Sequence, residues 1–172
     1  MWALIRDGAV TELTGIDPKG RFHPSLQWEP AAGAVAVGDL FDGQAFSRPL
    51  ESLTDIATRK REALEVGRKA SEQAGITYNG IRYAGDPSNR QALMEALDLA
   101  DTTGQTTFAS WKDSDGLFHA DHPVADVRQA LLDIATRRGQ LIVHEGELNA
   151  QIDTALVAED RTALEAVEWS EA

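Results

Sequence analysis

The sequence of 172 residues contains no cysteine. This absence excludes disulfide bonds, thiolate nucleophiles and cysteine-ligated zinc sites. No segment approaches the roughly 18 consecutive apolar residues that a membrane-spanning helix requires. The first residues, Met1 to Asp7, meet charge too early for a signal peptide. We therefore expect a soluble protein that is made in the cytosol.

Basic residues are also scarce, with 16 Lys and Arg against 28 Asp and Glu and a formal net charge of −12. Affinity for nucleic acid depends on basic side chains that neutralise phosphates. The basic groups Arg59-Lys60-Arg61, Arg68-Lys69 and Arg137-Arg138 lie among acids in predicted helices, which is typical of solvated helix faces. The sequence therefore predicts no nucleic-acid partner and no membrane partner.

Motifs for catalysis or cofactor binding are missing as well. The sequence has no Gly-x-Ser-x-Gly, no phosphate-binding Gly-x-x-x-x-Gly-Lys-Ser/Thr and no Gly-x-Gly-x-x-Gly. His119-Ala-Asp-His122 brings two imidazoles and a carboxylate together, but no fourth metal ligand is evident. Asp113-Ser-Asp115-Gly116 begins like a calcium loop, yet Val124 stands where the loop's last Glu belongs. We expect no enzyme activity, no cofactor and no metal.

The fold class that the patterns indicate is α+β, in three segments. Residues 1–49 predict a small β module, with hairpin turns at Asp7-Gly8 and Asp42-Gly43. Such a module has little surface to bury, so we expect it to pack on other helices or on a partner. Residues 50–157 predict a mixed domain, and residues 158–172 an acidic helical tail whose Leu164, Val167 and Trp169 dock elsewhere.

The mixed domain is predicted to consist of helices that alternate with aromatic hairpins. A helix over Leu50–Ala74 ends at Gly75, and Asn79-Gly80 forms the turn of a hairpin. Ser88 is the expected N-cap of a second helix that ends near Gly104. A hairpin over residues 106–119 follows, and then a long helix capped by Asp121 or His122, with Pro123 at its first position.

The long final helix carries apolar residues at alternating spacings of four and three. They are Val127, Leu131, Ile134, Leu141, Leu148 and Ile152, with Arg138, Glu145 and Ala155 in the same heptad series. Two interpretations remain open. The series is either the packing face of a helix within the domain, or a seam for self-association through those six apolar residues.

Aromatic residues make up only 6% of the chain, but they gather in the predicted hairpins and strands. Those of the two hairpins in the mixed domain predict the core of a small α/β unit. Trp and Tyr are also favoured anchors in protein interfaces. We therefore expect Trp28, Phe41, Phe46 and Trp111 as candidate partner-binding residues.

From Leu53 to Leu156 the chain resembles the phage-tail domain of unknown function DUF4376. The residues that carry the resemblance are Arg59 to Arg68, Ile76 to Gly80, Asp86 to Arg90, Trp111 to Phe118 and Val124 to Ala155. Trp2 to Pro49, and Gly38 to Pro49 above all, resembles the β segment that precedes this domain in tail-fibre and tail-fibre-assembly proteins.

The resemblance implies a phage or prophage tail component, or a chaperone for tail-fibre assembly, located in the virion tail or in the host cytoplasm. The implied partner is a tail-fibre or baseplate protein, with a homo-oligomer, most readily a trimer, as a further expectation. The alternative is a receptor-binding tip that contacts host glycan or protein. A cell-wall hydrolase is a third interpretation, for which the resemblance supplies no catalytic residue.

Overall fold

The computed structural model describes residues 1–170, in two compact units. The first, Met1–Ser52, is called the β unit below, and the second, which begins at Leu53, the helical unit. The first helix begins at Leu53, three residues after its predicted start at Leu50. The predicted mixture of strands, helices and a long final helix is confirmed.

The β unit is one antiparallel sheet with the strand order β3-β1-β2-β4-β5. Its strands are β1 (Trp2–Arg6), β2 (Ala9–Thr14), β3 (Gln27–Pro30), β4 (Leu40–Phe41) and β5 (Phe46–Ser47). Asp7 and Gly8 both have positive φ, as a tight hairpin turn between β1 and β2 requires. The core consists of small and β-branched residues: Ala3, Ile5, Val10 and Ala31.

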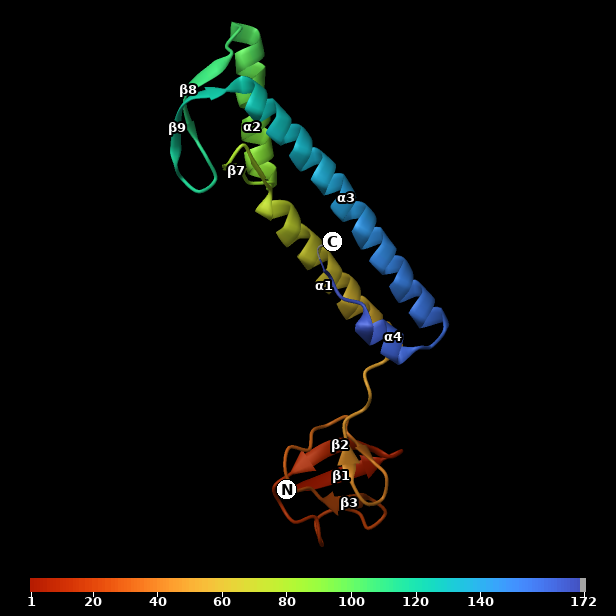
Figure 1. The fold of residues 1–172 in the computed structure, drawn as a ribbon. Coiled ribbons are helices and arrows are strands. Elements are labelled where there is room, and N and C mark those ends of the chain that lie inside the picture. Colours follow the sequence, from red (N-terminus) through yellow and green to blue (C-terminus); the bar gives the residue numbers. More distant parts are fainter. Residues whose placement is uncertain (171–172) are drawn as a thin grey trace. The chain divides into compact units, whose positions relative to one another are not determined.

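The helical unit is an elongated arrangement in which α1 (Leu53–Ala74) and α3 (Val124–Val157) lie side by side (Figure 1). Helix α2 (Pro87–Thr103) packs on the first half of α3, and the short α4 (Arg161–Ala166) packs beside the second half. Within residues 1–170, none of the helices combines the length and the hydropathy needed to cross a membrane.

Two aromatic hairpins cover the end of the unit at which α2 and α3 meet. The first pairs β6 (Ile76–Tyr78) with β7 (Ile81–Tyr83), and the second pairs β8 (Thr107–Lys112) with β9 (Phe118–Pro123). Asn79 and Gly80 have φ of 48° and 78°, so the predicted turn is confirmed. The aromatic core cluster here contains buried Tyr83, Leu93, Leu97, Val127 and Ile134, with Tyr78, Phe108 and Trp111 packed against it.

The helix starts differ from the prediction at two places. Asp86 is the N-cap of α2 instead of Ser88, because Pro87 occupies the first turn and the Asp86 carboxylate accepts bonds from the N–H groups of Ser88 and Asn89. Hydrogen bonds from the side chains of Ser88 and Asn89, together with these backbone bonds, lower the pKa of Asp86 to about 2. At α3, strand β9 continues to Pro123, so His122 is a strand residue and caps nothing.

The junction between α1 and α2 depends on two glycines. A Cβ on Gly75 would lie 1.9 Å from the Tyr83 carbonyl oxygen, and one on Gly85 would lie 2.1 Å from the Glu72 carbonyl oxygen. Only glycine allows the backbone of the first hairpin to close this tightly on the end of α1. The hairpin is thereby held against the end of α1.

The predicted acidic tail is part of the helical unit. Leu164 and Val167 are buried with Ile56, Leu64 and Ile152 between α1 and α3, in what we call the second core cluster. Trp169 lies against Gly67 of α1, where a Cβ would be 2.4 Å from the indole Cγ, and its Nε1 donates to Ser71 Oγ at 3.1 Å. The expected docking of Leu164, Val167 and Trp169 is confirmed.

Candidate functional site

Polar residues from both hairpins converge in one group, in which Tyr83 and His122 are buried and His119 is partly exposed. Tyr83 Oη lies 2.7 Å from His122 Nε2, and His119 Nε2 lies 2.8 Å from Asp113 Oδ2. The two imidazole rings are 6.3 Å apart, and Trp111 lies 5.5 Å from the His122 ring. His119 and His122 are the two histidines whose proximity the sequence indicates.

The electrostatics of this group favour neutral side chains in its interior. Burial lowers the pKa of His122 and, with smaller contributions from nearby acids, raises the pKa of Tyr83 to about 12. The hydrogen bond from His119 is the largest cause that lowers the pKa of Asp113. Asp113 also accepts from the N–H groups of Asp115 and Leu117, which fixes the loop between β8 and β9.

The four side chains of this arrangement make hydrogen bonds within the chain. The hollow beside it measures only about 30 Å³, too small for a substrate. Among residues 1–170, no three His, Cys, Asp or Glu side chains are placed to hold one metal ion. The bond between His122 and Tyr83 joins the second hairpin to the first, and the bond between His119 and Asp113 fixes the second hairpin's own loop.

The four predicted partner-binding aromatics are found in three settings. Trp111 packs against the aromatic core cluster, 5.1 Å from Phe108 and 6.3 Å from Tyr83. Phe41 and Phe46 form a tilted pair at 4.7 Å that covers the core of the β unit. Trp28 is half-buried on the edge strand β3, 4.8 Å from the exposed Phe22.

Trp28 lines one of the open hollows on the surface. This aromatic groove of the β unit measures about 590 Å³ and is lined chiefly by Trp2, Phe22, Trp28, Asp17 and His23. The Trp28 Nε1 atom is buried and finds no hydrogen-bond acceptor among the described residues. Aromatic faces beside polar side chains in a concave surface are a common setting for ligand recognition.

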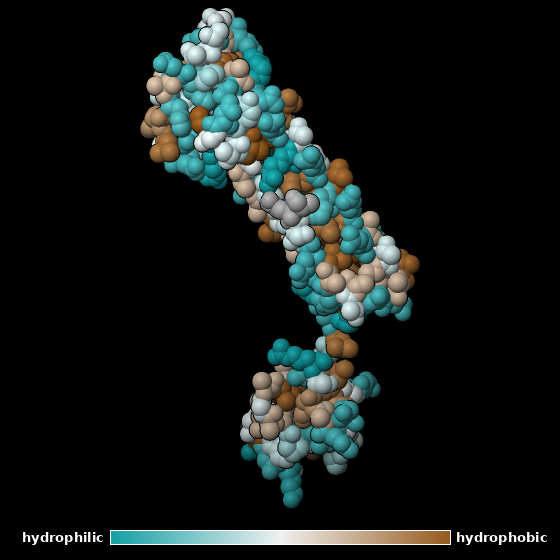
Figure 2. All heavy atoms as spheres, viewed as in Figure 1, coloured by the Kyte–Doolittle hydropathy of each residue, from teal (hydrophilic) through white to brown (hydrophobic). Residues whose placement is uncertain are grey.

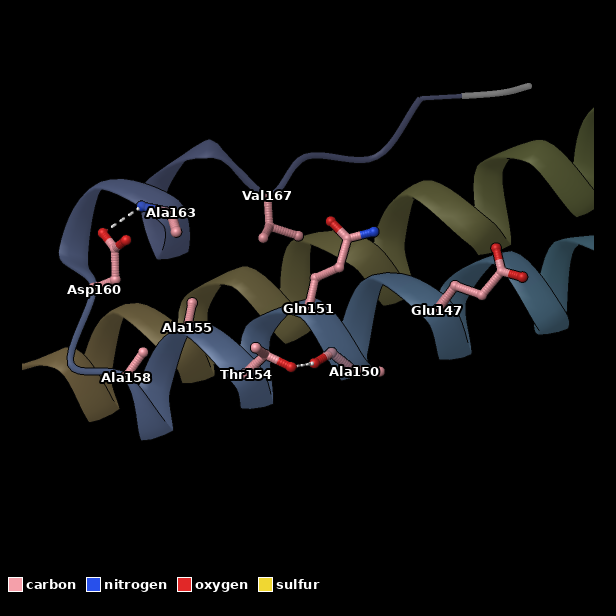
Figure 3. Close-up of a pocket in the computed structure, with 9 residues that line it drawn as sticks. All are labelled: Glu147, Ala150, Gln151, Thr154, Ala155, Ala158, Asp160, Ala163 and Val167. Atoms are coloured by element: carbon pink, nitrogen blue, oxygen red, sulfur yellow. Dashed lines mark hydrogen bonds between the residues drawn. The ribbon is translucent and has the colours of Figure 1, made fainter.

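A second open hollow lies between the last turns of α3 and α4 (Figure 3). It measures about 450 Å³, and its walls include four alanines together with Gln151 and Thr154 of α3 and Val167 of the tail. The Asp160 carboxylate at its end accepts from the Ala163 N–H and caps α4 (Figure 3). The other charged residue of the lining is Glu147, whose carboxylate lies 3.9 Å from His144 Nδ1.

The predicted self-association residues are packed inside the chain. Val127, Ile134, Leu141, Leu148 and Ile152 are buried, and Leu131 packs half-buried against the aromatic core cluster. The two charged members of the series contact α1: Arg138 Nε lies 3.4 Å from Glu72, and Glu145 lies 2.7 Å from Arg68 Nε. We call this the inner face of α3, and the structure fills it from within the chain.

A second heptad series on α3 was missed by the sequence reasoning. Leu132, Ile142 and Val143 are 59%, 42% and 62% exposed. Leu132 and Val143 lie on the side of the helix away from the inner face, and Ile142 lies at the flank of that face, about 100° round the helix from Leu141. Figure 2 shows exposed hydrophobic side chains along the edge of the helical unit on which α3 runs. The signal was present as spacings of three and four from Leu132 to Gly146, but glycine and alanine fill three of those five positions.

Residues 55–169 match the model of a family described as Domain of unknown function (DUF4376). The chain belongs to this family. The match runs through α4 to Trp169, which agrees with the packing of the tail in the helical unit. No curated protein and no solved structure matches the chain.

Proposed function

We propose that the chain is a phage or prophage tail protein, either a virion component or a tail-fibre assembly chaperone, that acts by protein–protein contact. Its partner is a tail-fibre or baseplate protein, and it works in the virion tail or in the host cytoplasm during assembly. The resemblance of residues 38–49 to tail-fibre sequences supports the phage assignment.

The observation that carries the contact mechanism is the use of polar side chains in the helical unit. Its most buried polar residues, Lys60, Ser71, Asp113 and His122, each bond to another part of the same chain. Polar groups that make hydrogen bonds within the chain position its backbone and side chains, and they are not available to a substrate. The aromatic groove of the β unit and the hollow between α3 and α4 are lined largely by aromatic or small apolar residues, which suits contact surfaces.

The β unit is the part that we assign to the fibre or baseplate partner. Its aromatic groove combines Trp2, Phe22 and Trp28 on one concave surface, and Trp residues in pockets are frequent anchors of interfaces. Trp28→Ala is expected to abolish capture of the fibre partner. Phe41→Leu, which changes an aromatic that packs on the core away from the groove, is the control that leaves capture intact.

Mass spectrometry of particles from the strain that encodes the chain tests the proposal. A fixed copy number in purified particles supports a virion component. Absence from particles together with co-purification with the fibre protein from the lysate supports an assembly chaperone. If the chain is absent from purified particles and also does not co-purify with the fibre protein, in cells that produce complete particles, the proposal is contradicted.

A receptor-binding tip is the second candidate, and Trp28 favours it. Trp28 lies beside Asp17 and His23 in the aromatic groove, and aromatic faces with polar neighbours suit the apolar faces of sugar rings. Binding of the purified chain to host cells, lost in Trp28→Ala and retained in Phe41→Leu, would support this function. Absence of cell binding by the wild-type chain would exclude it.

A further inference from the structure

The outer face of α3 is an uncovered apolar surface on the longest helix of the chain. We define it by Leu132, Ala135, Gly139, Ile142, Val143 and Gly146, all of which are exposed. Five of these six positions follow heptad spacing, the pattern by which one helix packs along another. A soluble domain rarely leaves such a continuous apolar stripe without a partner.

The two glycines of this face have no explanation within the chain. A Cβ on Gly139 or on Gly146 would meet no described atom within 4 Å. Glycine in a helix interior costs about 1 kcal/mol relative to alanine. Gly67 of α1 shows what a helical glycine does in this unit, because its missing Cβ makes room for Trp169. Gly139 and Gly146 make the same room, and nothing in the same chain fills it.

The charges at the two ends of the outer face indicate which helix packs on it. Arg128 and Asp153 continue the same heptad series, one on each side of the apolar stretch, and their midpoint falls between Gln140 and Leu141. In an antiparallel pair of α3 helices centred there, each Arg128 faces Asp153 of the other copy. In a parallel pair or trimer, Arg128 would face Arg128 and Asp153 would face Asp153, which is repulsive.

In the same register Ile142 and Ala135 meet small positions, and Leu132 meets Asn149. Antiparallel pairing about that midpoint sets Ile142 of one copy opposite Gly139 of the other, and Ala135 opposite Gly146. A large side chain then meets the position that has no side chain, as close helix packing requires. A parallel arrangement would place glycine against glycine and isoleucine against isoleucine.

We propose that a second copy of this chain packs antiparallel on the outer face of α3 and forms a two-fold symmetric dimer. Two-fold dimers are the commonest closed assemblies of identical chains. Arg128 and Asp153 each have a surface partner in their own chain, Asp101 at 2.5 Å and Arg61 at 2.5 Å, and pairing joins these into two charge networks. The proposal does not depend on what the β unit binds.

Sedimentation equilibrium of the full chain tests this pairing. The wild-type chain is expected at twice its monomer mass of 18.7 kDa. Ile142→Glu is expected to raise the dissociation constant at least tenfold, because it places a carboxylate opposite Gly139 of the partner. Leu99→Glu, at an apolar site on α2 that is 57% exposed against 42% for Ile142, is the matched control and should leave the dimer intact.

Two further variants distinguish the orientation of the pair and guard against misfolding. Arg128→Asp should weaken the dimer, and adding Asp153→Arg to it should restore the dimer, since opposite charges again face each other. Gly139→Gln should also dissociate the dimer while its circular dichroism stays helical, because its Cβ meets nothing in the monomer. A monomeric or trimeric wild-type chain, or a dimer that survives both Ile142→Glu and Gly139→Gln, would overturn the proposal.

Discussion

The inner and outer faces of α3 obey the same spacing rule but have different compositions. The inner face carries Val127, Ile134, Leu148 and Ile152, which the chain buries in its own two core clusters. The outer face alternates large residues with glycine and alanine, and within residues 1–170 no element covers it. Heptad spacing therefore identifies a packing face, while side-chain size and flanking charge indicate what packs there.

The charges on the two faces differ in the same way. Arg138 and Glu145 of the inner face pair with Glu72 and Arg68 of α1, beside the junction of α1 with the first hairpin. Arg128 and Asp153 of the outer face lie on the surface and form exposed ion pairs. Glu145 is thus mostly buried beside its counter-ion Arg68, whereas the Arg138 side chain is 47% exposed, close to the 54% of Arg128.

The largest expected difference concerns an isoleucine on each face. Ile152→Ala should cost about 2–5 kcal/mol of unfolding free energy, because Ile152 is 0% exposed and its loss leaves a cavity. Ile142→Ala should cost less than about 1 kcal/mol in the monomer. Urea unfolding followed by circular dichroism, at a concentration that keeps the chain monomeric, measures both. Equal losses would contradict the division into two faces.

A charge on each face gives the next contrast. Glu145→Gln should cost about 1–3 kcal/mol, because the mostly buried Arg68 loses one of its two carboxylate partners. Arg128→Gln should cost roughly 0–1 kcal/mol, since its pair with Asp101 is exposed and screened. The same unfolding measurement in low and in high salt tests this, and a larger effect for Arg128 in the monomer would be inconsistent with the structure.

Alanine at two helical glycines should act in opposite directions. Gly67→Ala is expected to destabilise the helical unit by about 1–3 kcal/mol, because the new Cβ collides with Trp169. Gly139→Ala should stabilise the monomer by up to about 1 kcal/mol, since alanine is the better helix former and meets nothing there. Thermal unfolding reports both signs, and a loss of stability in Gly139→Ala would show that the chain itself covers the outer face.

The smallest expected effect is a pH dependence of stability, which comes from His122, buried beside Tyr83. Burial lowers the pKa of His122 in the folded state, so the unfolded chain binds more protons once the pH falls below roughly 6.5, the ordinary histidine value. Stability should therefore fall with pH from there until the folded pKa is reached, by at most about 1.4 kcal/mol per pH unit.

His122→Phe should flatten this slope near pH 6, whereas His144→Gln, at the more exposed histidine whose ring contacts Trp169, should keep it. Unfolding free energies measured between pH 5 and 8 decide the matter. A slope that persists in His122→Phe would assign the dependence to another group.

Much of the fold follows from local sequence signals. Two turns and one helix end are marked by residues that permit the required backbone conformation. These are Asp7-Gly8, Asn79-Gly80 and Gly104, and all five residues have positive φ. Ser88 was mistaken for the N-cap because Asp86 and Ser88 both suit that role, and the choice depends on Pro87 between them. Local signals of this kind act over a few residues.

Long-range pairings were less accessible. Nothing in the spacing of α1 shows that Gly67 receives Trp169 from the far end of the chain, or that His122 leaves the helix to bond Tyr83. The inner face was identified from its residues, but the sequence did not distinguish a partner in the same chain from one in another copy. That distinction requires knowing which residues the fold has already buried.

The arrangement of two copies about the outer face is tested most directly by distances between spin labels. The chain contains no cysteine, so one introduced cysteine gives one distance across the dimer. In the antiparallel pair, labels at Gln140→Cys lie near the symmetry axis and within about 25 Å, whereas labels at Val157→Cys lie about 50 Å apart, from the helix rise. Short distances at both positions would show a parallel assembly, and no distance at either would show a monomer; both results would contradict this account.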